Sequence, residues 1–179
     1  MAERIRVTFD SDLRRSRLAA LFRLPLAIVP ALSLAFWTVA ALVLLVASWA
    51  ITAVRGSVPP ELQRLQLRYL QSLVRFAAWF GLVSAPRNVS VHVDRATQRR
   101  VRVVLRPLLA LPAIVLASVL AVALAWTTVG AWFAALAFGR TTHGLQELGA
   151  FCIRYEAETL AYLMLLTPCY PAVAPQTPQ

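Results

Sequence analysis

The sequence contains no lysine, two cysteines, two histidines and six glycines among 179 residues. It has no glycine-rich phosphate loop, no Gly-x-Ser-x-Gly turn and no pair of carboxylates within an apolar segment. Neither His92 and His143 nor Cys152 and Cys169 have the spacing of metal ligands. The sequence therefore predicts no catalytic residue, no metal site and no cofactor, and we expect a protein that is not an enzyme.

Charged residues are also scarce, at 15%, whereas hydrophobic residues make up 59%. Ordinary soluble domains carry about 25% charged residues. Residues 24–54 and 107–139 contain no charged residue over 31 and 33 positions, and about 20 residues suffice for a helix to cross the hydrocarbon core. The composition predicts an all-α integral membrane protein with two long transmembrane helices.

The basic residues are all arginine, and they exceed the acidic residues by ten. Most of them flank the apolar segments, where each basic residue contributes about 1 kcal/mol to binding anionic lipids. A high pI is also typical of nucleic-acid-binding proteins, but no recognised nucleic-acid motif accompanies these arginines. We therefore expect contact with the membrane and its anionic lipids, and not with nucleic acid. The arginines expected to contact lipid are Arg14, Arg15, Arg17, Arg23, Arg99, Arg100, Arg102 and Arg106.

Two stretches, residues 5–10 and 89–94, alternate apolar and polar residues, which is typical of half-buried strands. Each is followed by a basic stretch, at 12–23 and 96–106, and then by one of the apolar segments. We predict that each unit comprises a short strand, a basic helix, a long transmembrane helix and an amphipathic helix. The two strands could pair as a small sheet on the cytoplasmic side.

The chain thus reads as two copies of one unit. A shift of 83 residues superposes Trp49 on Trp132 and Gly56 on Gly139, whereas the strands need a shift of 84. We predict two tandem membrane repeats followed by a flexible tail rich in proline and glutamine. The boundaries are 1–84 and 85–170 for the repeats and 171–179 for the tail.

The amphipathic helices are predicted over 61–83 and 144–167. In the first, Arg64, Arg68 and Arg75 share one side of the helical wheel. The shift of 83 places Arg64 on Glu147 and Arg75 on Glu158, so that a basic face in one repeat matches an acidic face in the other. The hypothesis is that these four residues form ion pairs between the repeats; the alternative is that both faces are solvated. Whether the helices cross the membrane or lie at its interface stays open.

Charge also predicts a topology. If each repeat crosses out and back, residues 1–23 and 85–106 share one side with twelve arginines, against two in the opposite loops. The positive-inside rule places this side in the cytoplasm. We predict a multi-pass protein of the bacterial inner (plasma) membrane, with parallel repeats and both termini cytoplasmic. A reticulon-type hairpin within one leaflet would keep the same bias, although residues 31–54 lack glycine, proline or asparagine for a turn.

Three stretches of the second half resemble an uncharacterised bacterial membrane family, domain of unknown function 4389. They are VVLRPLLALPAIVL (103–116), WFAALAFGR (132–140) and TLAYLMLLTPCYP (159–171). The first half reads as a diverged copy. It lacks a counterpart to Tyr170-Pro171, and the second copy has Pro168-Cys169 where the family usually shows a polar or acidic residue. The resemblance supports a duplicated membrane fold and implies no catalytic residue.

Size, duplication and the absence of catalytic motifs favour a non-enzymatic accessory or scaffold subunit of a larger cell-envelope assembly, with other membrane proteins as partners. One alternative is a lipid-binding or membrane-shaping protein that uses its arginine-rich amphipathic helices. A second is a small transporter with Arg75 and Glu158 at the repeat interface. Transport ranks last because the repeats read as parallel and the apolar segments lack the glycines of broken helices.

Overall fold

The computed structural model describes most of the chain as helix. The described residues are 6–8, 17–55, 59–83, 90–92, 100–139, 141–167 and 169–171. They form four helices and two short strands. In chain order these are β1 (Arg6–Thr8), α1 (Arg17–Arg55), α2 (Pro60–Phe80), β2 (Ser90–His92), α3 (Arg100–Phe138) and α4 (His143–Leu163).

The helices come in two matched pairs. The long helices α1 and α3 both have 39 residues, and the short helices α2 and α4 both have 21. Corresponding helices begin 83 residues apart, at Arg17 and Arg100 and at Pro60 and His143. α2 starts with a proline. Proline lacks a backbone N–H, but at the first position of a helix an N–H would have no helical partner.

The basic and apolar parts of each repeat were predicted as separate helices, and this is wrong. α1 runs without interruption from its arginines through Pro25 and Pro30 into the apolar segment. Each proline removes one backbone hydrogen bond, which leaves most of the ladder of so long a helix in place. The amphipathic helices are also shorter than predicted, since α2 ends at Phe80 and α4 at Leu163.

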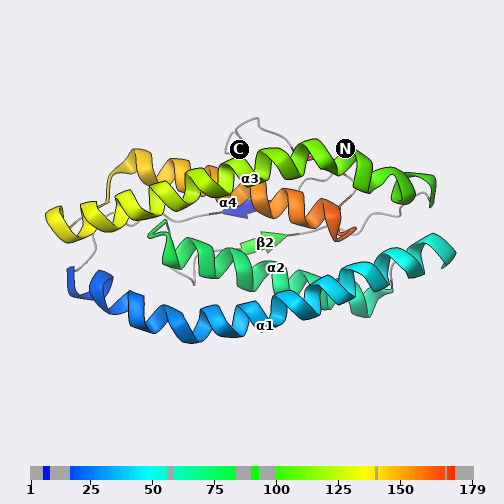
Figure 1. The fold of residues 1–179 in the computed structure, drawn as a ribbon, viewed down its shortest axis with the longest axis horizontal. Helices are drawn as coiled ribbons and strands as arrows, with labels where there is room; N and C mark the ends of the chain where they lie inside the picture. The colour runs from blue at the N-terminus through cyan, green and yellow to red at the C-terminus, as the bar shows by residue number, and fades with distance from the viewer. Residues whose placement is uncertain are drawn as a thin grey trace.

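Each long helix pairs with the short helix that follows it, so that α1 with α2 and α3 with α4 form two antiparallel hairpins. The hairpins also contact each other, α1 against α3 and α2 against α4. Figure 1 shows α1 running from left to right and α3 from right to left. The two hairpins therefore point in opposite directions, which corrects the prediction of parallel repeats. The chain leaves α2 at one end of the molecule and enters α3 at the other.

The two strands form an antiparallel ladder that pairs Arg6 with His92, Val7 with Val91 and Thr8 with Ser90. They lie near the middle of the long axis of the molecule (Figure 1). The pairing joins the segment before the first hairpin to the segment between the hairpins.

The core lies where α2 contacts α4. Three buried residues from each helix, spaced four apart, belong to one cluster. They are Leu70, Val74 and Ala78 of α2 and Ile153, Ala157 and Ala161 of α4. Each is at most 3% exposed. Because several of them are small, the two helix backbones can approach closely.

Both short helices end in the same turn. Leu82 and Leu165 each have a φ of 59°, in the left-handed region that favours glycine. The amide of the residue after each leucine donates to a carbonyl of the last helical turn, Val83 to Ala78 and Leu166 to Ala161, both at 3.0 Å. Both leucine side chains are at most 1% exposed, so burial offsets the conformational cost of about 1 kcal/mol.

Candidate functional site

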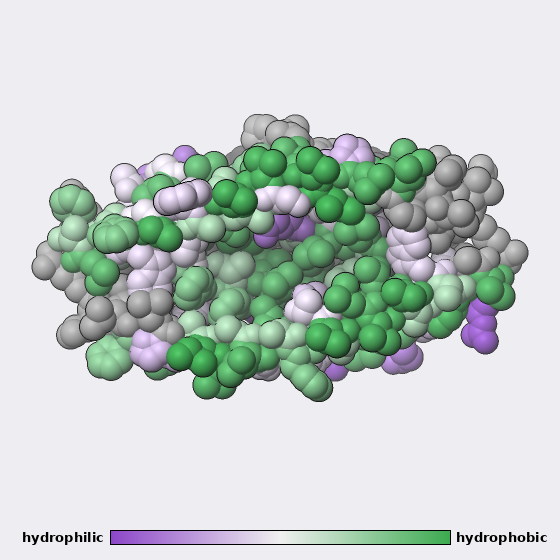
Figure 2. Space-filling view, viewed as in Figure 1, coloured by the Kyte–Doolittle hydropathy of each residue, from purple (hydrophilic) through white to green (hydrophobic). Residues whose placement is uncertain are grey.

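The long helices carry most of their apolar side chains on the outside. The stretches Pro25–Thr52 of α1 and Leu108–Phe138 of α3 are long and apolar enough to cross a membrane, and almost none of either stretch is buried. Phe36 and Trp126, for example, are 77% and 73% exposed. Figure 2 shows hydrophobic residues over most of the described surface of one face. An exposed apolar surface of this extent indicates a membrane protein.

α2 carries a polar stripe on its exposed side. The stripe consists of Glu61, Arg64, Arg68, Ser72 and Arg75, all exposed and spaced three or four residues apart. The opposite side of α2 contacts α1 and α4 through the buried part of the helix. The stripe therefore points away from the buried contact that α2 makes with these helices.

A groove opens where this stripe meets the first half of α1, and we call it the basic groove. Its volume is about 560 Å³. Four polar residues of α2 line it, namely Arg68, Gln71, Ser72 and Arg75. The apolar lining comes from Leu26 and Pro30 of α1 and Phe76 and Trp79 of α2. Two guanidinium groups thus lie beside an apolar wall, a combination suited to an amphiphile with an anionic group.

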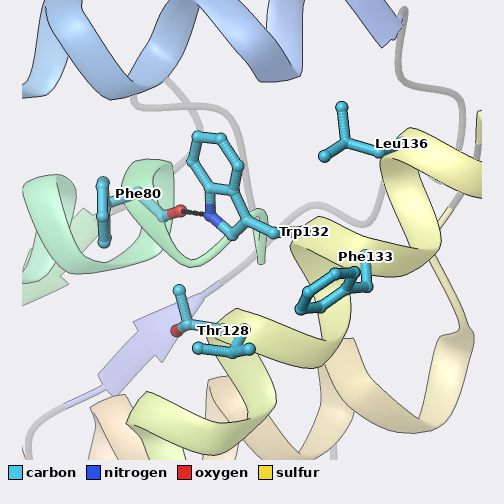
Figure 3. Close-up of a pocket in the computed structure, with 6 residues that line it drawn as sticks. Phe80, Thr128, Trp132, Phe133 and Leu136 are labelled. Carbon is cyan, nitrogen blue, oxygen red and sulfur yellow. Dashed lines mark hydrogen bonds between the residues drawn. The ribbon is translucent and has the colours of Figure 1, made fainter.

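A second cavity, of about 250 Å³, is purely apolar. Figure 3 shows its lining: Phe80 at the end of α2, and Thr128, Val129, Trp132, Phe133 and Leu136 of α3. It offers space for a hydrocarbon group but no charged group to orient one.

The Trp132 indole at this cavity connects the two hairpins. Its Nε1 donates to the carbonyl oxygen of Phe80 at 3.2 Å (Figure 3). Trp49 of α1 makes the equivalent bond in the other direction, to the carbonyl oxygen of Leu163 at 3.0 Å. Each bond satisfies a carbonyl at the end of a short helix. The sequence comparison aligned Trp49 with Trp132 but did not predict these bonds.

The C-terminal half of the matching face of α4 is buried instead of exposed. Tyr155, Glu158 and Tyr162 are 3–5% exposed, and the rings of Tyr162 and Tyr170 meet edge to face at 5.6 Å. Burial raises the pKa of the Tyr155 phenol, and the Tyr170 and Glu158 groups raise it further. The ring contact between Tyr162 and Tyr170 brings the segment after α4 back against the helix.

Two further groups of α4 are perturbed by burial. Burial raises the pKa of the Glu156 carboxyl, and its Oε1 has no hydrogen-bond partner among the described residues. Burial also raises the pKa of the Cys152 thiol, with the Glu156 carboxylate adding to the shift. A fully buried thiol of raised pKa is unreactive.

The ion pairs predicted between the repeats do not form at Arg64 and Glu147. Arg64 lies 3.4 Å from Glu61 in its own helix, and Glu147 lies 3.4 Å from His143, the first residue of α4. Both pairs are exposed. Arg75 is also exposed, whereas Glu158 is only 4% exposed, so these two equivalent positions differ in burial.

The structure gives no side-chain contacts for the arginines that were predicted to contact lipid. Arg14, Arg15 and Arg99 lie outside the described residues. Arg17 and Arg23 belong to the first turns of α1. The first turns of α3 contain Arg100, Arg102 and Arg106. Their contact with lipid stays a prediction.

Comparison with known proteins supports the resemblance found in the second half. Residues 100–174 match the model of the family described as Domain of unknown function (DUF4389). This match covers α3, α4 and the segment that follows them. No curated protein and no solved structure matches the chain.

Proposed function

We propose that this chain, whose second hairpin matches the DUF4389 family, is a non-enzymatic membrane protein that lies along one leaflet and binds lipid. Its long axis would run parallel to the membrane plane. α1 and α3 would be immersed among acyl chains, and α2 would lie at the level of the headgroups. The polar stripe of α2 is the observation that carries this proposal.

The stripe lies beside the most apolar part of α1. Tyr69 Oη and Thr38 Oγ1 share a hydrogen bond at 3.0 Å, and Gln66 Nε2 donates to Ser48 Oγ at 3.2 Å. Both partners fall within Pro25–Thr52. If α1 crossed the bilayer upright, Arg68, next to Tyr69 at the level of Thr38, would face hydrocarbon near its centre, at about 2.5–3.5 kcal/mol.

A flat orientation removes this penalty, because the stripe then faces headgroups and water. It also suits the length of the long helices. At 1.5 Å per residue, a helix of 39 residues is about 58 Å long, nearly twice the hydrocarbon thickness of about 30 Å. The combination of apolar helices below and basic residues above is typical of membrane-shaping proteins, which widen one leaflet.

We propose further that the two hairpins are a tandem duplication and that the protein lies in the cytoplasmic leaflet. The equal helix lengths and the two turns at Leu82 and Leu165 support a duplication. In the flat orientation the opposite directions of the hairpins leave the arginine-rich starts of α1 and α3 on the same leaflet. The bias of arginines to one side then still favours the cytoplasmic leaflet of a bacterial inner membrane.

Labelling of single cysteines tests the orientation. In a background where Cys152 and Cys169 are replaced by serine, Glu61→Cys and His143→Cys place one thiol at the exposed start of each short helix. We expect a membrane-impermeant maleimide to label both from the cytoplasmic side only. Upright hairpins arranged as in Figure 1 would give labelling from opposite sides, and upright parallel repeats would give both from the outside. Either result would rule out the flat orientation.

The accessory or scaffold role is a second candidate, favoured by the breadth of the exposed apolar surface of α1 and α3. Partner helices would cover part of this surface. Purification in native nanodiscs that yields a stoichiometric second membrane protein would support this role, and a chain that always purifies alone would count against it. Transport gains no support, because the contact between α2 and α4 is a packed apolar cluster within the described residues.

A further inference from the structure

We propose that the basic groove binds the headgroup of one anionic phospholipid, with the acyl chains along the apolar surface of α1. The inference rests on the proposed membrane location but adds a defined binding site. It is distinct from the diffuse attraction of anionic lipid predicted for the arginines at the starts of α1 and α3.

The two arginines of the groove are placed to hold one phosphate. Arg68 and Arg75 are two turns apart on the same side of α2, about 10 Å along the helix. Both are exposed, and within the described part of the chain neither makes an ion pair. Arg64, one turn before Arg68, instead lies 3.4 Å from Glu61. The positive charge at the groove therefore has no acidic counterpart there, and a phosphodiester supplies one.

The apolar part of the groove lining is suited to the glycerol and upper acyl region of a lipid. Leu26 is 62% exposed at the beginning of the apolar stretch of α1, and Phe76 lies 6.2 Å from Trp79 between ring centroids. Tryptophan is common at the boundary between headgroups and hydrocarbon. The groove thus continues directly onto the exposed apolar surface of α1, where acyl chains would extend. A soluble anion would leave this apolar wall uncovered.

The second hairpin lacks the two arginines at the equivalent positions of α4. At a shift of 83, Arg68 and Arg75 correspond to Phe151 and Glu158, and Glu158 is 4% exposed. The same helical framework therefore carries a cationic groove in one hairpin and a closed, acidic position in the other. We infer a single lipid site per chain, in the first hairpin.

The site can be tested by native mass spectrometry of the protein released from nanodiscs of equal parts phosphatidylcholine and phosphatidylglycerol. We expect the wild type to retain one phosphatidylglycerol in preference to phosphatidylcholine. At roughly fivefold per arginine, Arg68→Gln with Arg75→Gln should reduce this preference about 30-fold. Excess inorganic phosphate should not displace the lipid.

Arg64→Gln is the matched control, because it removes one arginine from the same stripe but outside the groove. It should leave the preference unchanged, whereas Arg68→Gln alone should lower it about fivefold. Leu26→Trp, which fills the groove without changing charge, should also reduce retention. Equal effects of Arg64→Gln and Arg68→Gln would overturn the proposal, as would equal retention of the two lipids by the wild type or displacement by phosphate.

Two measurements separate failure of the site from failure of the proposed function. Circular dichroism and thermal unfolding in detergent establish that the double variant is folded. Both proteins should remain in nanodiscs of phosphatidylcholine alone. If the wild type left such nanodiscs, the membrane location would be wrong; if it stayed but showed no lipid preference, only the site would be wrong.

Discussion

The two hairpins share a backbone plan but differ in what covers their short helices. In the first, the outer side of α2 is exposed and basic. In the second, the C-terminal half of the matching side of α4 is buried and contains Tyr155 and Glu158. The shared frame requires only matched helix lengths, end turns and core positions, whereas the outer face can have a different chemistry in each hairpin. The proposed lipid site therefore lies where the two hairpins differ.

The largest expected effect comes from the reciprocal tryptophans. Trp132→Ala removes a 9% exposed indole and its bond to the Phe80 carbonyl, and should lower the free energy of unfolding by about 3 kcal/mol. Trp49 is less buried, so that Trp49→Ala should lower it by about 2 kcal/mol. Unfolding in mixed detergent micelles measures both. Equal and negligible losses would show that these bonds do not hold the hairpins together.

The next effect concerns glycines packed differently in the second hairpin. A Cβ on Gly149 would lie 2.7 Å from Val83 Cγ2, whereas one on Gly130 would approach nothing closer than 3.7 Å. Gly149→Ala should destabilise the protein by about 1–2 kcal/mol, and Gly130→Ala should stabilise it by about 0.5–1 kcal/mol. The same unfolding experiment compares them. If both variants are stabilised, α4 does not pack as closely on the first hairpin as described.

A smaller, pH-dependent effect is expected at Glu156, where the first repeat has Leu73. Because burial raises the folded-state pKa of Glu156, ionisation opposes folding. The penalty is absent below the unfolded-state pKa and fully present above the raised folded-state pKa. Glu156→Gln should therefore match the wild type near pH 4 and exceed its stability at neutral pH, by about 1 kcal/mol. A difference of the same size at both pH values would contradict this explanation.

The smallest effect is expected for the exposed pair of Arg64 and Glu61, which are 3.4 Å apart. Glu61→Gln should change the free energy of unfolding by less than about 0.5 kcal/mol, because exposed ion pairs are well screened. A double-mutant cycle with Arg64→Gln measures the coupling. A coupling well above 1 kcal/mol would mean that the stripe is shielded from water, and would favour a partner over headgroups.

Much of the fold could be predicted from periodicity and composition. The two apolar segments, the two amphipathic helices and the strand stretches around Val7 and Val91 were all predicted from the sequence. The prolines at Pro25 and Pro30 misled the assignment of helix starts, because a long apolar helix tolerates them. Local patterns establish such elements because their periods depend only on neighbouring residues.

The relative direction of the hairpins could not be predicted in this way. A sequence has the same hydrophobic periodicity whether its hairpins are parallel or opposed. A count of arginines on each side of the membrane does not show how the hairpins lie relative to each other. The ion-pair hypothesis paired Arg64 with Glu147 by sequence alignment alone, although each has an acidic or basic neighbour one turn away. Arg68 lay on the predicted basic face, but its groove depends on Leu26 and Pro30 of another helix. Contacts between distant segments decide these features.

The strand pairing has a consequence for how the chain is made. Val7 pairs with Val91. The first strand therefore cannot pair until the whole first hairpin and the following segment have left the ribosome. Synthesis delivers the N-terminal hairpin first, and a contact of such long sequence separation forms slowly. The ladder can therefore close only after the first hairpin and the segment that follows it have been synthesised.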